Sequence, residues 1–111
     1  MNITEENLGD GAVKLSLQGL LDRDGSAAAG PRLTRAVADF DTTLVDLKGV
    51  PAIGAAGLRV LVGAAMSVDR SRARLVAVNA PEAARRVMYT TGLDGIVNIA
   101  DDDATGYPDA A

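Results

Sequence analysis

The sequence predicts one α/β domain built on a mixed, mainly parallel β-sheet that is largely covered by helices. Short β-rich runs alternate with segments of helical periodicity, and this order requires crossover connections between parallel strands. The length of 111 residues fits a single domain with one hydrophobic core. Aromatic residues make up only 3% of the chain, so Leu, Val, Ile and Ala must build that core.

The first two elements are predicted to form an antiparallel β-hairpin. Residues 1–4 suit a short strand, and residues 7–11 (NLGDG) form a turn cluster in which the glycines tolerate positive φ. Ala12–Gln18 then alternates apolar and polar side chains with a period of two residues. The hairpin is therefore expected to add an antiparallel edge to the sheet.

A loop and an amphipathic helix are predicted next. Residues 20–26 (LLDRDGS) are rich in turn-forming residues and are expected to be a loop. Pro31 suits an early helical position, because its missing N–H would lack a partner there in any case. One apolar stripe with helical spacing follows, at Leu33, Ala36, Val37 and Phe40.

The middle of the chain predicts a strand, a loop, a helix and a second strand. Residues 43–47 (TLVDL) are short, β-rich and flanked by polar residues or Gly, as in a buried central strand. A loop at 48–55 leads into a helix over about 56–69. Arg74–Val78 (RLVAV) is then expected to be another buried strand.

The last helix carries recognisable end signals. Asn79 is predicted to cap it, with Pro81 in the first turn and Glu82 completing a capping box. The helix is expected to end at Thr91, because Gly92 suits the first position beyond a helix.

A final short strand is predicted over residues 96–99, which gives the order β-β-α-β-α-β-α-β. The domain is expected to span residues 1–100. The remaining segment, 101–111, is acidic, poor in apolar residues, and contains Pro and Gly. It is therefore predicted to be a disordered tail.

Composition excludes several kinds of chemistry. The chain lacks Cys and His, so thiolate or imidazole metal sites and His-based acid–base catalysis are absent. The net charge of −4 disfavours nucleic acid as a partner. No apolar run reaches membrane-spanning length and no signal peptide is evident, which predicts a soluble, cytoplasmic protein. No cofactor or metal is expected.

The helix predicted at 56–69 is unusual because it is almost free of charge, with Arg59 as the only charged residue before Asp69. The face expected to pack on the sheet consists of Leu58, Leu61, Val62, Ala65 and Met66. The opposite face consists of Ala56, Val60, Gly63, Ala64 and Ser67. A helix that is apolar nearly all round is buried or meets a partner. The alternative is that an Ala-rich sequence simply fills a surface helix with a good helix former.

Two segments of the sequence resemble the STAS family, the sulfate transporter and anti-sigma factor antagonist domains. They are TLVDLKGVPAIGAAGLRVLVGAA (43–65) and RLVAVNAPEAARRVMYTTGLDGIVNI (74–99), and the resemblance extends over about residues 13–99. It implies the STAS fold. It also implies a protein that binds other proteins and is not an enzyme.

The resemblance places the family's switch chemistry on residues that lack it. In the best-studied branch, a Ser directly before Gly-Leu is phosphorylated by an anti-sigma factor that is a serine kinase of the histidine-kinase-like ATPase type. That Ser corresponds to Ala56, the preceding position is Ala55, and the family's Asp corresponds to Gly54. Phosphorylation adds a charge of about −1.5 to −2 at an interface, which breaks the complex. A chain without that hydroxyl is expected to bind a partner and to escape this switch.

The expected partner-binding residues surround this loop and follow the outer helix face. They are Asp22, Gly54, Ala55, Ala56, Gly57, Arg59, Val60, Gly63, Ala64 and Ser67. Asp22 and Asp24 are considered as partner contacts because the resemblance places their loop beside the switch loop, although both also suit a turn. The hydroxyls of Thr90 and Thr91 are interpreted as structural.

Other functions stay open at this point. A scaffold or accessory STAS subunit of a stressosome-like assembly or of a lipid ABC transporter would use the same docking face, with the transporter ATPase as its partner. A small-ligand sensor is a third hypothesis, and the scarcity of aromatic residues disfavours a nucleotide pocket. The family resemblance leaves a homodimer open, and an enzyme is the least favoured class.

Overall fold

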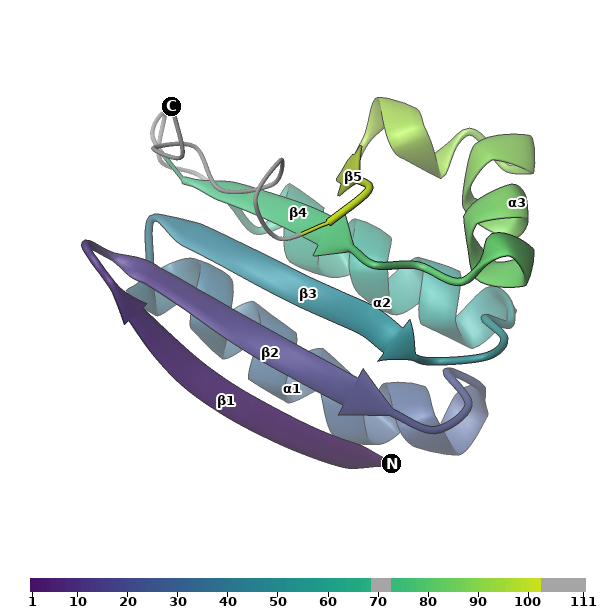
Figure 1. The fold of residues 1–111 in the computed structure, drawn as a ribbon, viewed down its shortest axis with the longest axis horizontal. Coiled ribbons are helices and arrows are strands. Elements are labelled where there is room, and N and C mark those ends of the chain that lie inside the picture. Colours follow the sequence, from purple (N-terminus) through teal and green to yellow (C-terminus); the bar gives the residue numbers. More distant parts are fainter. Residues whose placement is uncertain (69–72, 103–111) are drawn as a thin grey trace.

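The computed structural model describes residues 1–68 and 73–102, which form one five-stranded sheet and three α-helices (Figure 1). The strands lie in the order β1-β2-β3-β4-β5. The first pair is antiparallel and every later pair is parallel, which confirms the predicted mixed sheet. The tail predicted at 101–111 lies outside the described residues except for Asp101 and Asp102.

The N-terminal hairpin consists of β1 (Asn2–Gly9) and β2 (Ala12–Gln18). Its turn contains Asp10 and Gly11, both with the positive φ that such a tight reversal requires. The first strand is longer than the predicted 1–4. The reason is that pairing with β2 continues past Thr4 up to Gly9, where Ala12 is the partner. Ladder hydrogen bonds therefore extend the strand through Glu5, Glu6 and Asn7, whose side chains are polar and exposed, to the half-buried Leu8.

The first helix, α1 (Arg23–Asp39), begins well before Pro31, so the loop predicted at 20–26 is wrong for residues 23–26, which are helical. Asp22 is the N-cap, and its Oδ1 accepts a hydrogen bond of 3.0 Å from the Gly25 N–H. A capping aspartate is also a turn residue, and the sequence alone does not separate the two roles. Pro31 lies inside the helix, where it removes one backbone hydrogen bond that the packing of α1 must offset.

The central elements follow the sequence closely. β3 (Thr42–Gly49) contains the predicted strand 43–47, and β4 (Arg74–Val78) has the predicted bounds. Between them, α2 (Ala55–Met66) ends with Ser67 as its C-cap. The helix therefore ends about three residues before the predicted residue 69, so this predicted end is wrong.

The capping box predicted for the last helix is wrong. Asn79 has a φ of 58°, and the N-cap of α3 (Glu82–Thr90) is Pro81, which offers no side-chain hydrogen bond. Glu82 contacts Arg86 instead, with 2.7 Å between Oε1 and the guanidinium. The reason is geometric: a helix that begins at Glu82 leaves Asn79 outside the capping position.

The end of α3 is as predicted. Gly92 follows the helix with a φ of 78°, the left-handed conformation that Gly adopts without strain. A short 3-10 helix, η1 (Leu93–Gly95), then delays the last strand, β5 (Asn98–Ala100), beyond the expected 96–99. Ile96 is consequently 53% exposed instead of lying in a strand.

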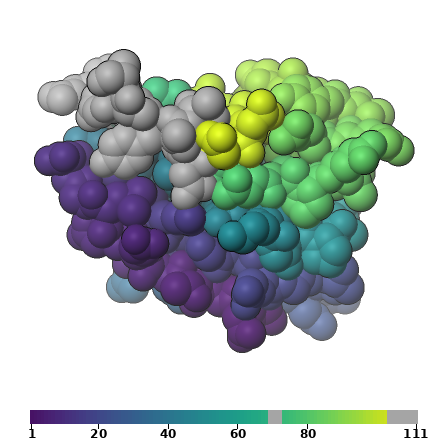
Figure 2. Space-filling view, in the orientation of Figure 1, coloured from purple at the N-terminus to yellow at the C-terminus, as the bar shows by residue number. Residues whose placement is uncertain are grey.

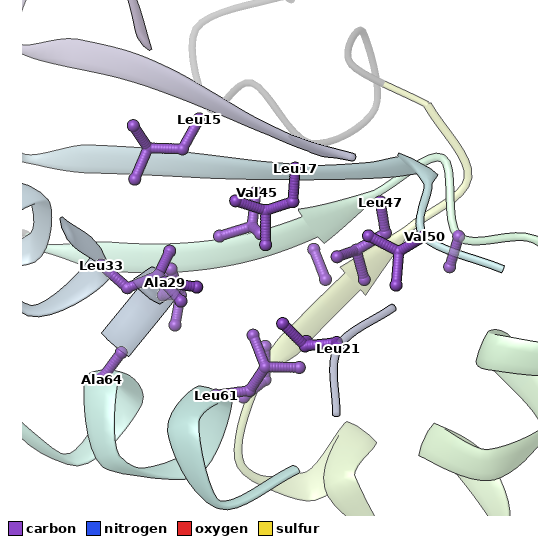
Figure 3. Packing of buried hydrophobic residues seen from close by; sticks show 14 of the residues in the cluster. Leu15, Leu17, Leu21, Ala29, Leu33, Val45, Leu47, Val50, Leu61 and Ala64 are labelled. Atoms are coloured by element: carbon purple, nitrogen blue, oxygen red, sulfur yellow. The ribbon is translucent and has the colours of Figure 1, made fainter. Parts of the chain in front are cut away.

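The main core lies between the sheet and the helices. Figure 1 shows α1 and α2 on the same side of the sheet, and Figure 3 shows Leu15, Leu17 and Val45 pointing from the strands toward them. Side chains of α3 and β4 join the same cluster. The expectation that helices cover most of the sheet is thus wrong for the second face, on which no helix of the described residues packs. That open face carries a smaller cluster built around Leu44, Val76 and Val78.

Candidate functional site

The candidate site lies where the chain leaves β2 and β3 and enters α1 and α2. Leu21 and Ile53 form a parallel bridge that continues the pairing of the two strands. The Leu21 N–H donates to the Ala52 carbonyl at 3.2 Å, and the Gly54 N–H donates to the Leu21 carbonyl at 3.1 Å. These bonds hold the first turns of α1 and α2 beside each other at one edge of the sheet.

Asp22 lies next to this loop, as the resemblance implied. A Cβ placed on Gly54 would be 4.0 Å from the Asp22 Cα. The Asp22 carboxylate caps its own helix, and the Asp22 carbonyl accepts the Ser26 N–H at 2.9 Å. The side chain therefore stabilises the start of α1, and it remains exposed to solvent.

The start of α2 has no comparable cap. Its N-cap is Gly54, in an extended conformation, and this residue makes no side-chain capping hydrogen bond. The first turn also contains no acidic residue. The first N–H groups of a helix carry a partial positive charge, so this end offers donors to a carbonyl or carboxylate from outside. Gly54 and Ala55 are exposed, and Ala56 is half-buried.

Gly57 has a packing role, which differs from the surface contact predicted for it. The residue is buried, and a Cβ there would lie 2.5 Å from the Leu21 carbonyl oxygen and 3.0 Å from Cγ2 of Ile53. Only a glycine lets α2 approach the bridge this closely.

The predicted division of α2 into an inner and an outer face is partly wrong. Ala64 was expected outside and is 1% exposed, whereas Met66 was expected against the sheet and is 76% exposed. The buried stripe is centred on Gly57, Leu61 and Ala64, because α2 packs on α1 as well as on the sheet. Figure 3 shows Ala64 beside Ala29 of α1.

Val60 lies at the border between the two faces and is half-buried. Its Cγ2 would be 3.6 Å from a Cβ placed on Gly30, so it packs against α1. The sequence predicts a docking surface from these small residues, but part of their effect is to bring α1 and α2 together. The face that is free of this contact is rotated away from Val60 and Ala64.

The outer face of α2 consists of the exposed residues Ala55, Arg59, Gly63, Met66 and Ser67. Four of the five were predicted, and Met66 was missed. Arg59 is the only charged residue of α2, and a Cβ on Gly63 would find open space. The Ser67 hydroxyl donates to the Ala64 carbonyl at 2.8 Å and so helps to end the helix.

The side chains at the start of α2 are small and bring little chemistry of their own. Ala55 and Ala56 supply no oxygen or nitrogen beyond the backbone, and the described residues contain no group of His, Cys, Asp or Glu suited to a metal ion. Such a surface suits close contact with another macromolecule.

Comparison with known proteins agrees with this fold. A family model described as "Mlab, STAS domain" matches residues 5–98, which is most of the chain. The chain belongs to the STAS family.

Solved STAS structures show the same architecture. An anti-sigma factor antagonist from Mycobacterium paratuberculosis is 24% identical, with a TM-score of 0.84 over 95% of this chain and 89% of that one. A putative anti-sigma factor antagonist from Thermotoga maritima is 22% identical, with a TM-score of 0.82 over 93% and 89%. The phosphorylated form of the Bacillus cell fate determinant SpoIIAA is 16% identical, with a TM-score of 0.70 over 94% and 96%.

No curated protein sequence matches the chain significantly. Among the described residues of this STAS protein, no helix is long and apolar enough to cross a membrane.

Proposed function

We propose that this STAS protein is an anti-sigma factor antagonist that binds an anti-sigma factor of the serine-kinase type and thereby regulates transcription. The uncapped start of α2 and the outer face of α2 form the binding surface. The observation that carries the proposal is an exposed helix end with free donors, no carboxylate in its first turn, and small uncharged neighbours. Its fold is shared with known anti-sigma factor antagonists.

The same surface explains why phosphorylation would not release the partner. Ala56 occupies the position that the family resemblance assigns to the phosphoacceptor, and Ala55 beside it also lacks a hydroxyl. Binding is therefore constitutive at this site. The chain performs no catalysis of its own, and any ATP that is consumed belongs to the partner kinase.

The test uses a variant that changes the surface but not the fold. Gly63→Glu adds a charge where open space surrounds the helix. We expect it to weaken anti-sigma factor binding at least tenfold, which is about 1.4 kcal/mol, in a calorimetric titration. Ala83→Glu, at an exposed position of α3, is the matched control and should bind as the unchanged protein does. Equal binding by both variants would remove the outer face of α2 from the interface.

An accessory subunit of a lipid ABC transporter is the second candidate. The lack of a hydroxyl at Ala55 and Ala56 suits a subunit that stays bound to its ATPase, because such a subunit needs no phosphate switch. Purification of the tagged protein from its own cells separates the two cases. Stoichiometric recovery of a transporter ATPase, with loss of that recovery in Gly63→Glu, would replace the anti-sigma factor by the ATPase as the partner.

A further inference from the structure

A polar pocket opens at the carboxyl ends of β2 and β3, on the face of the sheet opposite α2. Its volume is about 220 Å³, and its polar lining comes from Lys14, Ser16, Gln18, Asp46 and Lys48. Figure 2 views the molecule from this face, with β1 and β2 in purple to blue and the end of β3 in teal. The pocket is separate from the proposed docking surface and does not depend on it.

An irregularity in the sheet shapes this pocket. Ser16 pairs with Asp46, but Gln18 pairs with Gly49, so β3 contains an extra residue between the two pairs. Bulges of this kind re-aim side chains and are common beside binding sites. A Cβ on Gly49 would lie 2.8 Å from Cγ of Gln18 and 3.0 Å from the Leu17 carbonyl oxygen. A larger residue at position 49 would therefore displace the pocket wall.

The carboxylate of Asp46 is already engaged on both of its oxygens. It is 4% exposed, its Oδ2 lies 3.3 Å from Nζ of Lys14, and its Oδ1 accepts the Lys48 N–H at 2.9 Å. The groups left to meet a ligand are donors, namely the exposed ammonium of Lys48, the Ser16 hydroxyl and the Gln18 amide. Lys14 is paired with Asp46, and Glu6 of β1 lies opposite Lys14 in the strand register, so Lys48 is the cation of the lining that can meet an anion.

The distribution of lysine in the sequence also indicates this pocket as a binding site. The sequence contains nine arginines and only two lysines, Lys14 and Lys48, and both line this one pocket. Arg serves at the other cationic positions, among them the surface ion pairs with Glu5 and Glu82. A lysine ammonium is a compact point charge that fits a confined site where a planar guanidinium does not.

We infer that this pocket binds a small oxyanion, either inorganic phosphate or the phosphate group of a small ester. Its donors and its charge suit a phosphate, and its volume lies below the roughly 300–1,000 Å³ of pockets for drug-sized ligands. Lys48 supplies the charge-assisted hydrogen bond, Ser16 and Gln18 supply neutral ones, and Lys14 holds Asp46 in place.

A titration of the ¹⁵N-labelled full chain with sodium phosphate, at ionic strength held constant with NaCl, tests the inference by NMR. We expect saturable shifts of backbone amides within residues 14–18 and 46–49. Lys48→Gln should weaken binding at least tenfold, and Lys48→Arg should restore part of it. Arg35→Gln removes the same charge from an exposed position of α1 and should leave the titration unchanged, while the spectra report whether each variant is folded.

A parallel titration with glycerol phosphate distinguishes the two sources of the group. Tighter binding of the ester than of inorganic phosphate identifies a small organic phosphate as the ligand, and the reverse order identifies the free ion. Shifts that fail to saturate, that spread over the arginines, or that are equal in Lys48→Gln and Arg35→Gln would overturn the inference.

Discussion

The first turns of α1 and α2 lie side by side at one edge of the sheet, yet they are built differently. Each has a glycine as its third helical residue, Gly25 in α1 and Gly57 in α2, and both glycines are buried. The helix ends differ at the cap, where α1 has Asp22 and α2 has Gly54. Close packing is thus shared, whereas stabilisation of the helix end is confined to α1.

The comparison teaches which features of this edge serve the fold and which leave a surface open. At the start of α1, the Asp22 carboxylate accepts a hydrogen bond from the Gly25 N–H, so this helix is capped from within the chain. The start of α2 lacks both a cap and an acidic residue, so its donors stay available to a partner. The start of α1 is therefore stabilised by its own cap, whereas the neighbouring start of α2 is left open for docking.

The largest expected effect concerns the shared glycines. A Cβ on Gly25 would collide with the Leu20 carbonyl oxygen, and one on Gly57 would lie 2.5 Å from the Leu21 carbonyl oxygen. Gly25→Ala and Gly57→Ala should each lower the free energy of unfolding by about 2 kcal/mol or more, measured by urea denaturation. Gly63→Ala is the control, because an exposed helical glycine gains about 0.5–1 kcal/mol from this change. Stabilisation at all three positions would contradict the close packing.

The next effect tests the cap of α1. Asp22→Ala should destabilise the protein by about 1 kcal/mol, since the Gly25 N–H loses its acceptor. Asp24→Ala removes a neighbouring charge without removing the cap and should cost only about 0.3–0.5 kcal/mol. If the two variants have the same denaturation midpoint, Asp22 contributes only its charge.

The smallest effect has the opposite sign and concerns the start of α2. Gly54→Asp should stabilise the protein by about 0.5 kcal/mol, because an aspartate there can cap the helix and complement its dipole. The substitution fits, since a Cβ at this position would be 3.9 Å from its nearest neighbour, the Leu21 carbonyl oxygen. A decrease in the denaturation midpoint would show that the backbone N–H groups at the start of α2 already have acceptors.

The presence of five strands, the antiparallel hairpin and the parallel direction of the later strands could be predicted from the sequence, because the buried parallel strands are short continuous apolar runs bounded by turn signals. The spatial order of the strands was not predicted. The bounds of β4 and the position of Gly92 just beyond the end of α3 were also predicted correctly. The start of α1 could not be predicted, since Asp22, Gly25 and Pro31 are also typical of loops, and packing overrides their propensity. The sequence also predicted Asn79 as the cap of α3, whereas the structure places Asn79 outside that position.

The sequence indicated α2 as the candidate docking helix, but it did not show which side of α2 is exposed. Small and apolar residues surround the helix almost completely, so periodicity alone allowed a stripe rotated toward Met66 and away from Ala64. The burial of Gly57 is what fixes the inner side, because α2 meets the Leu21–Ile53 bridge only at a position without a side chain.

The most direct measurement is the lifetime of the complex with the purified anti-sigma kinase, with and without Mg-ATP, together with mass spectrometry of this protein. The unchanged chain should dissociate at the same rate in both conditions and carry no phosphate. The double variant Gly54→Asp, Ala56→Ser restores the acceptor and should dissociate at least tenfold faster once ATP is added. Release of the unchanged chain on addition of ATP, with phosphate on another Ser or Thr, would contradict constitutive binding through the open start of α2.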